Sequence, residues 1–255
     1  MVSVVICTRN YDMKLVKCLE SIYQQTYLDI QVIIETEGSI VEARKRGIAK
    51  ALGEYICLVD SDQILPHKLL EHCVELCKTY DGVTWTERGL FPSTFCEKVI
   101  DYDKMLFHQA HDDDPLFGAA EPRFFKAKFL RNLDFDKLPP ITFELSMINK
   151  QVSDMGAKIG FTDMTVYHHE PKTFRELFKK FFRYGFYYIP SLKYSKELVI
   201  RHSFPRRVYF RVTSFRRPLL YVGLWFHYFI KGIATGLGVL WYLLSRAGQG
   251  KTQAI

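Results

Sequence analysis

The chain has 255 residues and a net charge of +7, and this length allows one substantial hydrophobic core. Its six cysteines occur singly, mostly within apolar stretches, and never as a Cys-x-x-Cys pair. We therefore interpret them as small buried residues rather than as disulfides or zinc ligands. Met1 leads directly into an apolar stretch, so we expect no signal peptide and a cytoplasmic amino-terminal domain.

Apolar stretches and helical patterns alternate over the first sixty residues. Residues 2–7, 30–34 and 53–59 are predicted as buried strands, and amphipathic helices are expected over about 12–25 and 39–52. This order is a βαβαβ series. The sheet should therefore be parallel, and its three strands should end along one crevice.

The third of these strands runs directly into two carboxylates, Asp60 and Asp62, which one residue separates. Carboxylates at the carboxyl end of a strand lie at the edge of an α/β sheet where ligands bind. Oxygen ligands suit Mg²⁺ or Mn²⁺ carrying a substrate diphosphate, so the pattern suggests nucleotide-sugar chemistry. Such a pair alone is also common in turns and helix caps, so the neighbouring segments have to decide.

Four blocks resemble, in this order, the large family 2 of inverting glycosyltransferases. They are Val4–Asn10, Leu19–Thr26, Ala43–Ile48 and Gly53–Asp62, and the resemblance covers about residues 1–185. It implies the A-type (GT-A) nucleotide-sugar fold, an α/β domain with a mostly parallel central sheet. Within the family the chain looks like the dolichyl-phosphate mannose synthases and the small cellulose-synthase-like membrane enzymes.

The resemblance implies roles for the side chains that follow the first and third strands. Asp62 is expected to ligate the metal directly, and Asp60 to bind ribose or a metal-bound water. Thr8, Arg9 and Asn10 are expected to face the nucleotide. Turn formation and helix capping are the alternative roles for the residues after the first strand, Asn10 above all.

Further donor-side candidates follow from the same resemblance. Glu35 ends the second strand, where relatives place an acid that reads the base or ribose, although Glu37 could take its place. Arg44 could touch a phosphate or pair with a neighbouring acid. Ser61 and Gln63 complete the predicted nucleotide-sugar site, and Gln63 resembles the Gln of the mannose synthases, which falls one position later.

An inverting transfer needs one base for the acceptor proton, unless the acceptor is already an anion such as a lipid phosphate. Relatives carry a Glu-Asp pair at the start of a helix, and here the pair is Glu144-Leu145. The usual Asp is missing, so Glu144 is the candidate base, with a favourable helix-start charge as its alternative role. The acidic run at His111–Asp114 is interpreted as a solvated loop rather than a metal cluster.

Two further segments carry candidates by resemblance. His168 or His169 could complete the metal or diphosphate site, since neutral imidazole is an adequate ligand for Mn²⁺, although strand alternation should turn only one inward. The alternative is a surface histidine pair. Residues 180–184 resemble a relaxed Gln-x-x-Arg-Trp motif, which implies that Arg183 contacts the diphosphate and Tyr184 stacks at the acceptor entrance, with Lys180 also in the nucleotide-sugar site.

The positive charge is concentrated late in the chain. Residues 172–217 hold 13 Lys and Arg against 2 Asp and Glu, whereas residues 1–171 hold 19 against 26. The next 27 residues, 218–244, contain only Lys231 and His227 among lysine, arginine, histidine and acidic groups. As a helix they would reach about 40 Å, enough to cross a hydrocarbon layer of about 30 Å. A membrane is therefore the expected partner, and nucleic acid is not.

These features divide the chain into a catalytic domain at 1–171, basic interface helices at 172–217, a transmembrane segment at 218–244 and a tail at 245–255. Two amphipathic helices are expected near 173–188 and 205–215. Six arginines between Arg201 and Arg217 keep the catalytic domain cytoplasmic at the cell membrane. A buried helix of a soluble protein and a re-entrant hairpin broken near Lys231-Gly232 are the alternatives for the span.

The combined interpretation is a membrane-bound, metal-dependent inverting glycosyltransferase using Mn²⁺ or Mg²⁺. GDP-mannose is the leading donor and a UDP-hexose the second. The expected acceptor is lipid-linked, either a polyprenyl or dolichyl phosphate or a lipid-linked glycan. A nucleotidyltransferase lacks support because no Gly-rich phosphate loop follows the first strand, and a non-catalytic nucleotide- or lipid-binding partner is the remaining alternative.

Overall fold

The computed structural model describes residues 1–108, 121–139, 141–201 and 207–252. Its first part is the predicted βαβαβ series: β1 (Val2–Cys7), α1 (Met13–Tyr23), β2 (Ile30–Glu35), α2 (Ile40–Lys50) and β3 (Tyr55–Asp60). Strand β1 pairs in parallel with both β2 and β3, so Cys7, Glu35 and Asp60 lie side by side. The prediction of a parallel sheet with aligned strand ends is confirmed here.

Local side-chain contacts start both early helices. The Asp12 carboxylate accepts hydrogen bonds from the backbone N–H groups of Lys14 and Leu15 and caps α1. At α2, the Ser39 hydroxyl accepts from the Glu42 N–H while the Glu42 carboxylate accepts from the Ser39 N–H, which forms a capping box. These caps fix where each helix begins after its strand.

The sheet is completed by four further strands: β4 (Gln63–Ile64), β5 (Gly82–Gly89), β6 (Phe124–Lys126) and β7 (Ile159–His168). The strand order is β2-β1-β3-β6-β5-β7-β4, with β6 antiparallel to both β3 and β5. The last long strand, β7, pairs with β5 as far as Gly89 and His168, across an irregularity between Trp85 and Thr86, and so carries His168.

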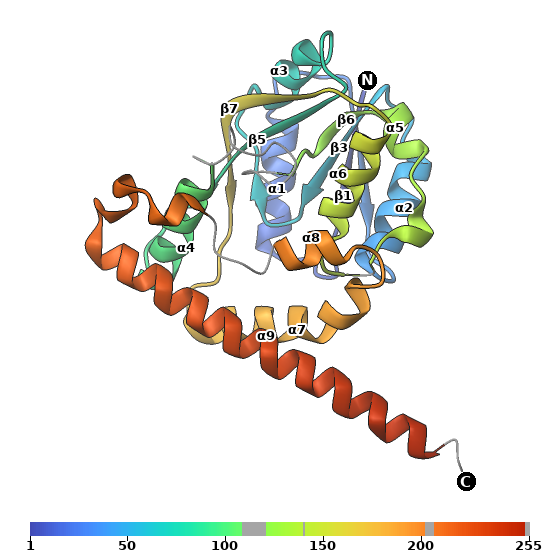
Figure 1. The fold of residues 1–255 in the computed structure, drawn as a ribbon. Helices are drawn as coiled ribbons and strands as arrows, with labels where there is room; N and C mark the ends of the chain where they lie inside the picture. The colour runs from blue at the N-terminus through green and yellow to red at the C-terminus, as the bar shows by residue number, and fades with distance from the viewer. Residues whose placement is uncertain (109–120, 140, 202–206, 253–255) are drawn as a thin grey trace.

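Helices cover both faces of this sheet (Figure 1). Alternation along β1 places Val5 in the core beneath α2 and α6 (Glu144–Asp154), whereas Val4 and Ile6 face α1 and α3 (Leu69–Leu76). The remaining elements of the domain are α4 (Phe95–His108), α5 (Ala127–Arg131) and the 3-10 helix η2 (Phe135–Lys137). All six cysteines are free thiols and five are buried, as predicted.

The carboxyl-terminal part begins with α7 (Phe174–Ser191) and α8 (Lys196–Arg201) and ends with α9 (Pro218–Thr252). The surface helix expected near 205–215 is replaced, over the described residues, by two short 3-10 helices, η3 (Arg207–Phe210) and η4 (Val212–Phe215). Helix α9 runs without a break past Lys231 and Gly232, so the hairpin alternative is wrong. Residues Pro218–Arg246 are long and apolar enough to cross a membrane, by length and composition only.

Helices α7 and α9 pack closely along each other below the sheet (Figure 1). Two glycines allow the contact. A Cβ on Gly185 of α7 would overlap the backbone of Thr235, and a Cβ on Gly238 of α9 would overlap the backbone of Phe182. At these two glycines the backbones of α7 and α9 are in direct contact, so the two helices form one closely packed layer.

Candidate active site

The carboxylate of Asp60, at the carboxyl end of β3, is held between two arginines. Arg44 of α2 places Nη2 3.3 Å from Oδ1, and Arg123, just before β6, places Nη2 2.8 Å from Oδ2. Burial raises the pKa of Asp60, but the two guanidinium groups outweigh burial and hold that pKa well below its usual value. Asp60 is therefore ionised, and both of its oxygens already have a cationic neighbour.

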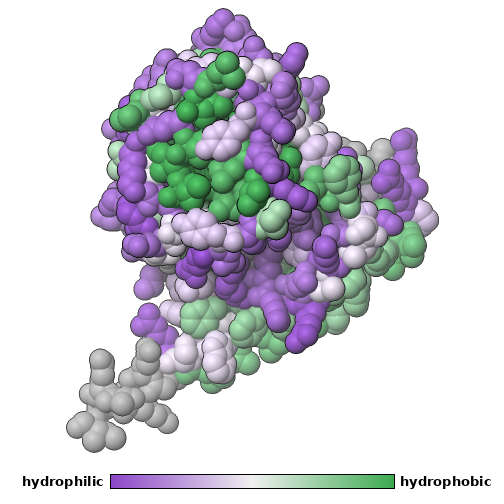
Figure 2. Space-filling model, turned by 180° about the vertical axis from the view of Figure 1, so that it is seen from behind, coloured by the Kyte–Doolittle hydropathy of each residue, from purple (hydrophilic) through white to green (hydrophobic). Residues whose placement is uncertain are grey.

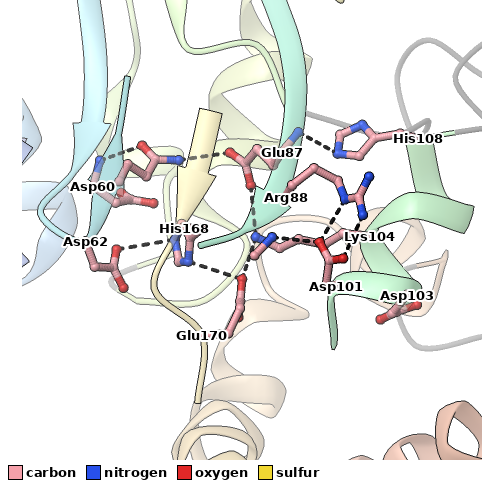
Figure 3. Close-up of polar contacts among 12 residues, drawn as sticks. Asp60, Asp62, Glu87, Arg88, Asp101, Asp103, Lys104, His108, His168 and Glu170 are labelled. Carbon is pink, nitrogen blue, oxygen red and sulfur yellow. Dashed lines mark hydrogen bonds and ion pairs between the residues drawn. The ribbon is translucent and has the colours of Figure 1, made fainter. Parts of the chain in front are cut away.

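Asp62 begins a chain of polar side chains that runs from the turn after β3 to α4 (Figure 3). Its Oδ1 lies 3.3 Å from Nε2 of His168, at the end of β7, and Nδ1 of His168 lies 3.3 Å from Oε1 of Glu170. The same oxygen of Glu170 lies 2.6 Å from Nζ of Lys104 on α4. Burial raises the pKa of Glu170, but Lys104 and His168 lower it well below its usual range.

A second connection joins the same groups through Glu87 of β5. Its Oε1 lies 3.4 Å from Nε of Arg123, and its Oε2 lies 3.6 Å from Nζ of Lys104. Gln63 is fully buried and links Glu87 to the end of β3. Its side-chain N–H group donates to Glu87, and its Oε1 accepts from the backbone N–H of Asp60. Both ends of its amide therefore contact the protein, and its place in the nucleotide-sugar site stays a prediction.

Four of these residues, Glu87, Lys104, Arg123 and Glu170, were not assigned from the sequence. Glu170 follows the two histidines directly and could have been found from that position. The other three are supplied by β5, α4 and the segment before β6, which are distant in the chain, and no local motif surrounds them.

Glu144 is the first residue of α6 and lies close to Asp60. Its Oε1 is 3.4 Å from Nη2 of Arg44, so one guanidinium contacts both acids. The carboxylate is buried, and this burial raises the pKa of Glu144 to about 7 although Arg44 lowers it. The predicted base therefore has a proton affinity matched to neutral pH.

The donor-side residues at the first two strand ends are arranged differently. Glu35 is buried and pairs with Arg46 at 3.1 Å and with Lys50, both on α2. Thr8, Arg9 and Asn10 lie in the turn after β1, with Arg9 and Asn10 exposed, and the Arg9 guanidinium donates to the carbonyl of Gly38. Ser61 lies between Asp60 and Asp62 in the turn after β3.

The candidates on α7 separate into two groups. Lys180 lies beside the site. Tyr184 raises the pKa of Lys180, burial lowers it, and Glu170 and Asp62 raise it, so this pKa lies above its usual value. Arg183 is exposed instead and lies against the ring of Tyr184, with 5.8 Å to its centroid. Among the described residues, the contact found for the Arg183 guanidinium is this ring and not Asp60 or Asp62.

The two histidines also differ. His168 faces Asp62 with its imidazole, whereas the described contact of His169 with Asp62 is made by its backbone N–H, which donates to the Asp62 carbonyl. The acidic run His111–Asp114 lies outside the described residues.

The groups around Asp62 fit a divalent cation of the Mn²⁺ type. Among the residues described, no group of three or more Cys, His, Asp and Glu side chains is arranged to hold a metal. Asp62 and His168 supply one carboxylate and one imidazole, a donor set that suits Mn²⁺, with Glu170 orienting the ring from its other nitrogen. Such ions in nucleotide sites commonly take their remaining ligands from phosphate oxygens and water.

No protein-family model matches the chain. Glycosyltransferase GlyG of Streptococcus pneumoniae serotype 4 is 30% identical to it in an alignment that covers 28% of this chain and 33% of GlyG. The match therefore spans about a third of that relative.

Two solved structures share the fold. Mannosyltransferase PcManGT from Pyrobaculum calidifontis, in complex with GDP-Man and Mn²⁺, superposes with a TM-score of 0.54 at 15% identity, over 99% of this chain and 79% of that one. Glucosyl-3-phosphoglycerate synthase from Mycobacterium tuberculosis, with Mn²⁺, UDP and phosphoglyceric acid, gives 0.50 at 18% identity, over 81% and 80%. The chain thus has a GT-A-like fold, which confirms the predicted fold class.

Replacing Arg123 tests the charge balance at Asp60. We expect Arg123→Gln to lower the free energy of unfolding by about 3 kcal/mol, because it leaves Asp60 and Glu87 short of a buried cation. Both acids have lowered pKa values in the folded state. The decrease in the free energy of unfolding should therefore have its full size above about pH 4.5 and become smaller at lower pH. Thermal and urea unfolding between pH 3 and 7 measure it.

Lys137→Gln is the matched control, because Lys137 forms an exposed ion pair with Asp134, and its loss should leave the free energy of unfolding nearly unchanged. Equal effects of the two substitutions would contradict a structural role for Arg123.

Proposed function

We propose that this protein is a metal-dependent inverting glycosyltransferase of family 2, which moves a hexose from a nucleotide sugar to a lipid-linked acceptor. The observation that carries the proposal is the position of Asp60 and Asp62. In a GT-A-like fold Asp60 ends β3 and Asp62 lies in the turn after it, with Arg44, Arg123 and His168 around them. A carboxylate pair beside two guanidinium groups and an imidazole at this edge suits a diphosphate and its metal.

Asp62 and His168 would hold the metal, which supplies neutralisation of the leaving diphosphate when it is bound. Glu170 keeps the His168 ring oriented, and Lys104 keeps Glu170 ionised. Arg44 and Arg123 each have a buried Nη1 that makes no hydrogen bond to described residues. These groups are suited to donate to phosphate or ribose oxygens of the donor, while Asp60 holds both guanidiniums in place.

Glu144 is our candidate base. The acceptor hydroxyl oxygen would attack the anomeric carbon as the bond to the diphosphate oxygen breaks, and the hydroxyl proton would pass to the Glu144 carboxylate. A phosphate acceptor is already an anion, so its transfer would need no base. Lys180, on the first half of α7 and under the electrostatic influence of Glu170 and Asp62, is suited to balance the diphosphate charge.

GDP-mannose is the favoured donor, and a UDP-hexose is the second candidate. PcManGT supports the first because its structure contains GDP-Man, and the mycobacterial synthase supports the second because its structure contains UDP. We further propose that the enzyme acts at the cell membrane with its catalytic domain on the cytoplasmic side. The long apolar helix α9 and the basic segment before it support this placement.

A donor screen tests this function. Purified protein with Mn²⁺ should gain thermal stability from GDP and GDP-mannose more than from UDP conjugates, because a ligand that binds only the folded state raises the unfolding midpoint. Asp62→Ala should abolish the Mn²⁺-dependent part of the gain. Asp136→Ala, an exposed acid of η2, is the control and should leave the gain unchanged.

Preferential stabilisation by UDP would select the UDP-hexose alternative. No response to either nucleotide would contradict the enzyme proposal and favour a non-catalytic partner. Binding that survives Asp62→Ala unchanged would move the metal site elsewhere.

Glu144→Gln separates catalysis from stability. With a hydroxyl acceptor, wild-type kcat/KM should fall about tenfold for each pH unit below 7, because the base must be ionised, and the variant should lose at least 100-fold in kcat. The same substitution should increase the free energy of unfolding although it decreases activity. The folded-state pKa of Glu144 lies above the ordinary 4.5, so the acid destabilises the protein increasingly from pH 4.5 to 7.

Removing that acid should therefore raise the free energy of unfolding above pH 7, by up to about 3 kcal/mol. Glu20→Gln, an exposed acid of α1, should change neither quantity. Full activity of Glu144→Gln on a hydroxyl acceptor would rule Glu144 out as the base.

A further inference from the structure

The exposed apolar side chains of α9 lie on one side of the helix. From Leu219 they recur at intervals of three or four residues through Phe226, Phe229, Ile233 and Leu237 to Leu244, each between 44% and 71% exposed. This spacing keeps them on one face of an α-helix. We call this face the α9 stripe. It extends over about 38 Å at 1.5 Å per residue, and α9 forms a largely apolar band along the lower margin of Figure 2.

The opposite face of α9 is packed against the protein. Leu224 lies in a cluster with Tyr102 and Leu106 of α4, and Ala234 and Gly238 are buried. His227 and Lys231, the two charged or titratable side chains noted within the predicted span, both point toward Asp103 of α4, at 3.8 Å each. The helix thus has one protein-facing side and one apolar outer side.

Helix α7 accompanies α9 over much of its length. Contacts run from Phe181 against His227, through Gly185 against Thr235, to Phe186 against Tyr242. If α9 crossed a bilayer in this arrangement, α7 would enter the hydrocarbon with Lys179, Lys180 and Arg183. Charged side chains at that depth are costly, and Lys180 is also drawn to the acids of the candidate active site.

Basic side chains flank the stripe at both ends. Arg216 and Arg217 directly precede it and Arg246 follows it, and all three are exposed. Arg175 and Arg183 are exposed on the adjoining α7. A long apolar face bordered by arginines complements a bilayer surface with anionic headgroups, where apolar side chains enter the acyl boundary and arginines contact phosphate.

We propose that α9 lies in the plane of one membrane leaflet, with the α9 stripe in the acyl boundary and the flanking arginines among anionic headgroups, rather than crossing the bilayer. The inference rests on the membrane association of the proposed function, but not on its chemistry. It replaces the predicted span at 218–244 and puts the end of α9 on the same side of the membrane as the catalytic domain.

The first test is the position of the carboxyl terminus. The full chain, carrying a protease-cleavable tag after Ile255, is added to preformed sealed vesicles of phosphatidylcholine and phosphatidylglycerol, and is also reconstituted from detergent. In both preparations, molecules whose catalytic domain is accessible to external protease should lose the tag to that protease. A tag protected in these molecules until detergent is added would establish a span and overturn the proposal.

The second test addresses the stripe itself. Phe229→Glu should weaken sedimentation with anionic vesicles about tenfold, because one large side chain can no longer enter the acyl boundary. Leu52→Glu is the matched control, a 75% exposed leucine outside the α9 stripe that should have no effect. Binding should also weaken when phosphatidylglycerol is omitted.

Each variant is first checked for an unchanged unfolding midpoint in detergent. Unaltered vesicle binding by Phe229→Glu would overturn the proposal, as would a stable dimer that this substitution dissociates, which would identify a second copy as the occupant. Nucleotide stabilisation with Mn²⁺, measured on the same samples, reports separately on the proposed function.

Discussion

The charge balance around Asp60 is the constraint on which the candidate site depends. Asp60, Asp62, Glu87, Glu144 and Glu170 gather at one edge of the sheet, and like charges at such distances would repel one another. Three cations are interleaved with them: Arg44 from α2, Lys104 from α4 and Arg123 from the segment before β6. Because each cation contacts two of these acids, the site is held as one network.

The same network connects the site to α9 through one helix, α4. Consecutive residues of α4 face different partners, since Asp103 lies near His227 and Lys231 of α9, and Lys104 contacts Glu170 and Glu87. Tyr209 of η3 donates a hydrogen bond to Asp103 and strengthens that side. The packing of α9 on α4 therefore affects the position of Lys104. Lys104 contacts Glu170, and Glu170 in turn contacts the ring of His168.

Sequence patterns predicted the parts of the molecule whose causes are local. Hydrophobic periodicity and capping residues predicted β1 to β3, α1 and α2, because these signals lie within each segment, and the family resemblance predicted the helix start at Glu144. Arg123, Glu87 and Lys104 could not be found in that way, since pairing of β6 with β3 and β5 brings Arg123 and Glu87 together and the packing of α4 adds Lys104. The burial of Gln63 and its hydrogen bond to Glu87 could not be predicted either, because Glu87 lies on β5, far away in the sequence. The length of residues 218–244 suggested a span, whereas only the packing of α7 shows which face of α9 is outward.

The position of a bound metal tests the central claim most directly. Crystals of the protein with Mn²⁺ and GDP, measured for anomalous scattering at the manganese edge, should show one peak within about 2.0–2.3 Å of a carboxylate oxygen of Asp62 and of Nε2 of His168. A nucleotide bound with its metal on other residues, or bound away from the carboxyl end of β3, would contradict the account.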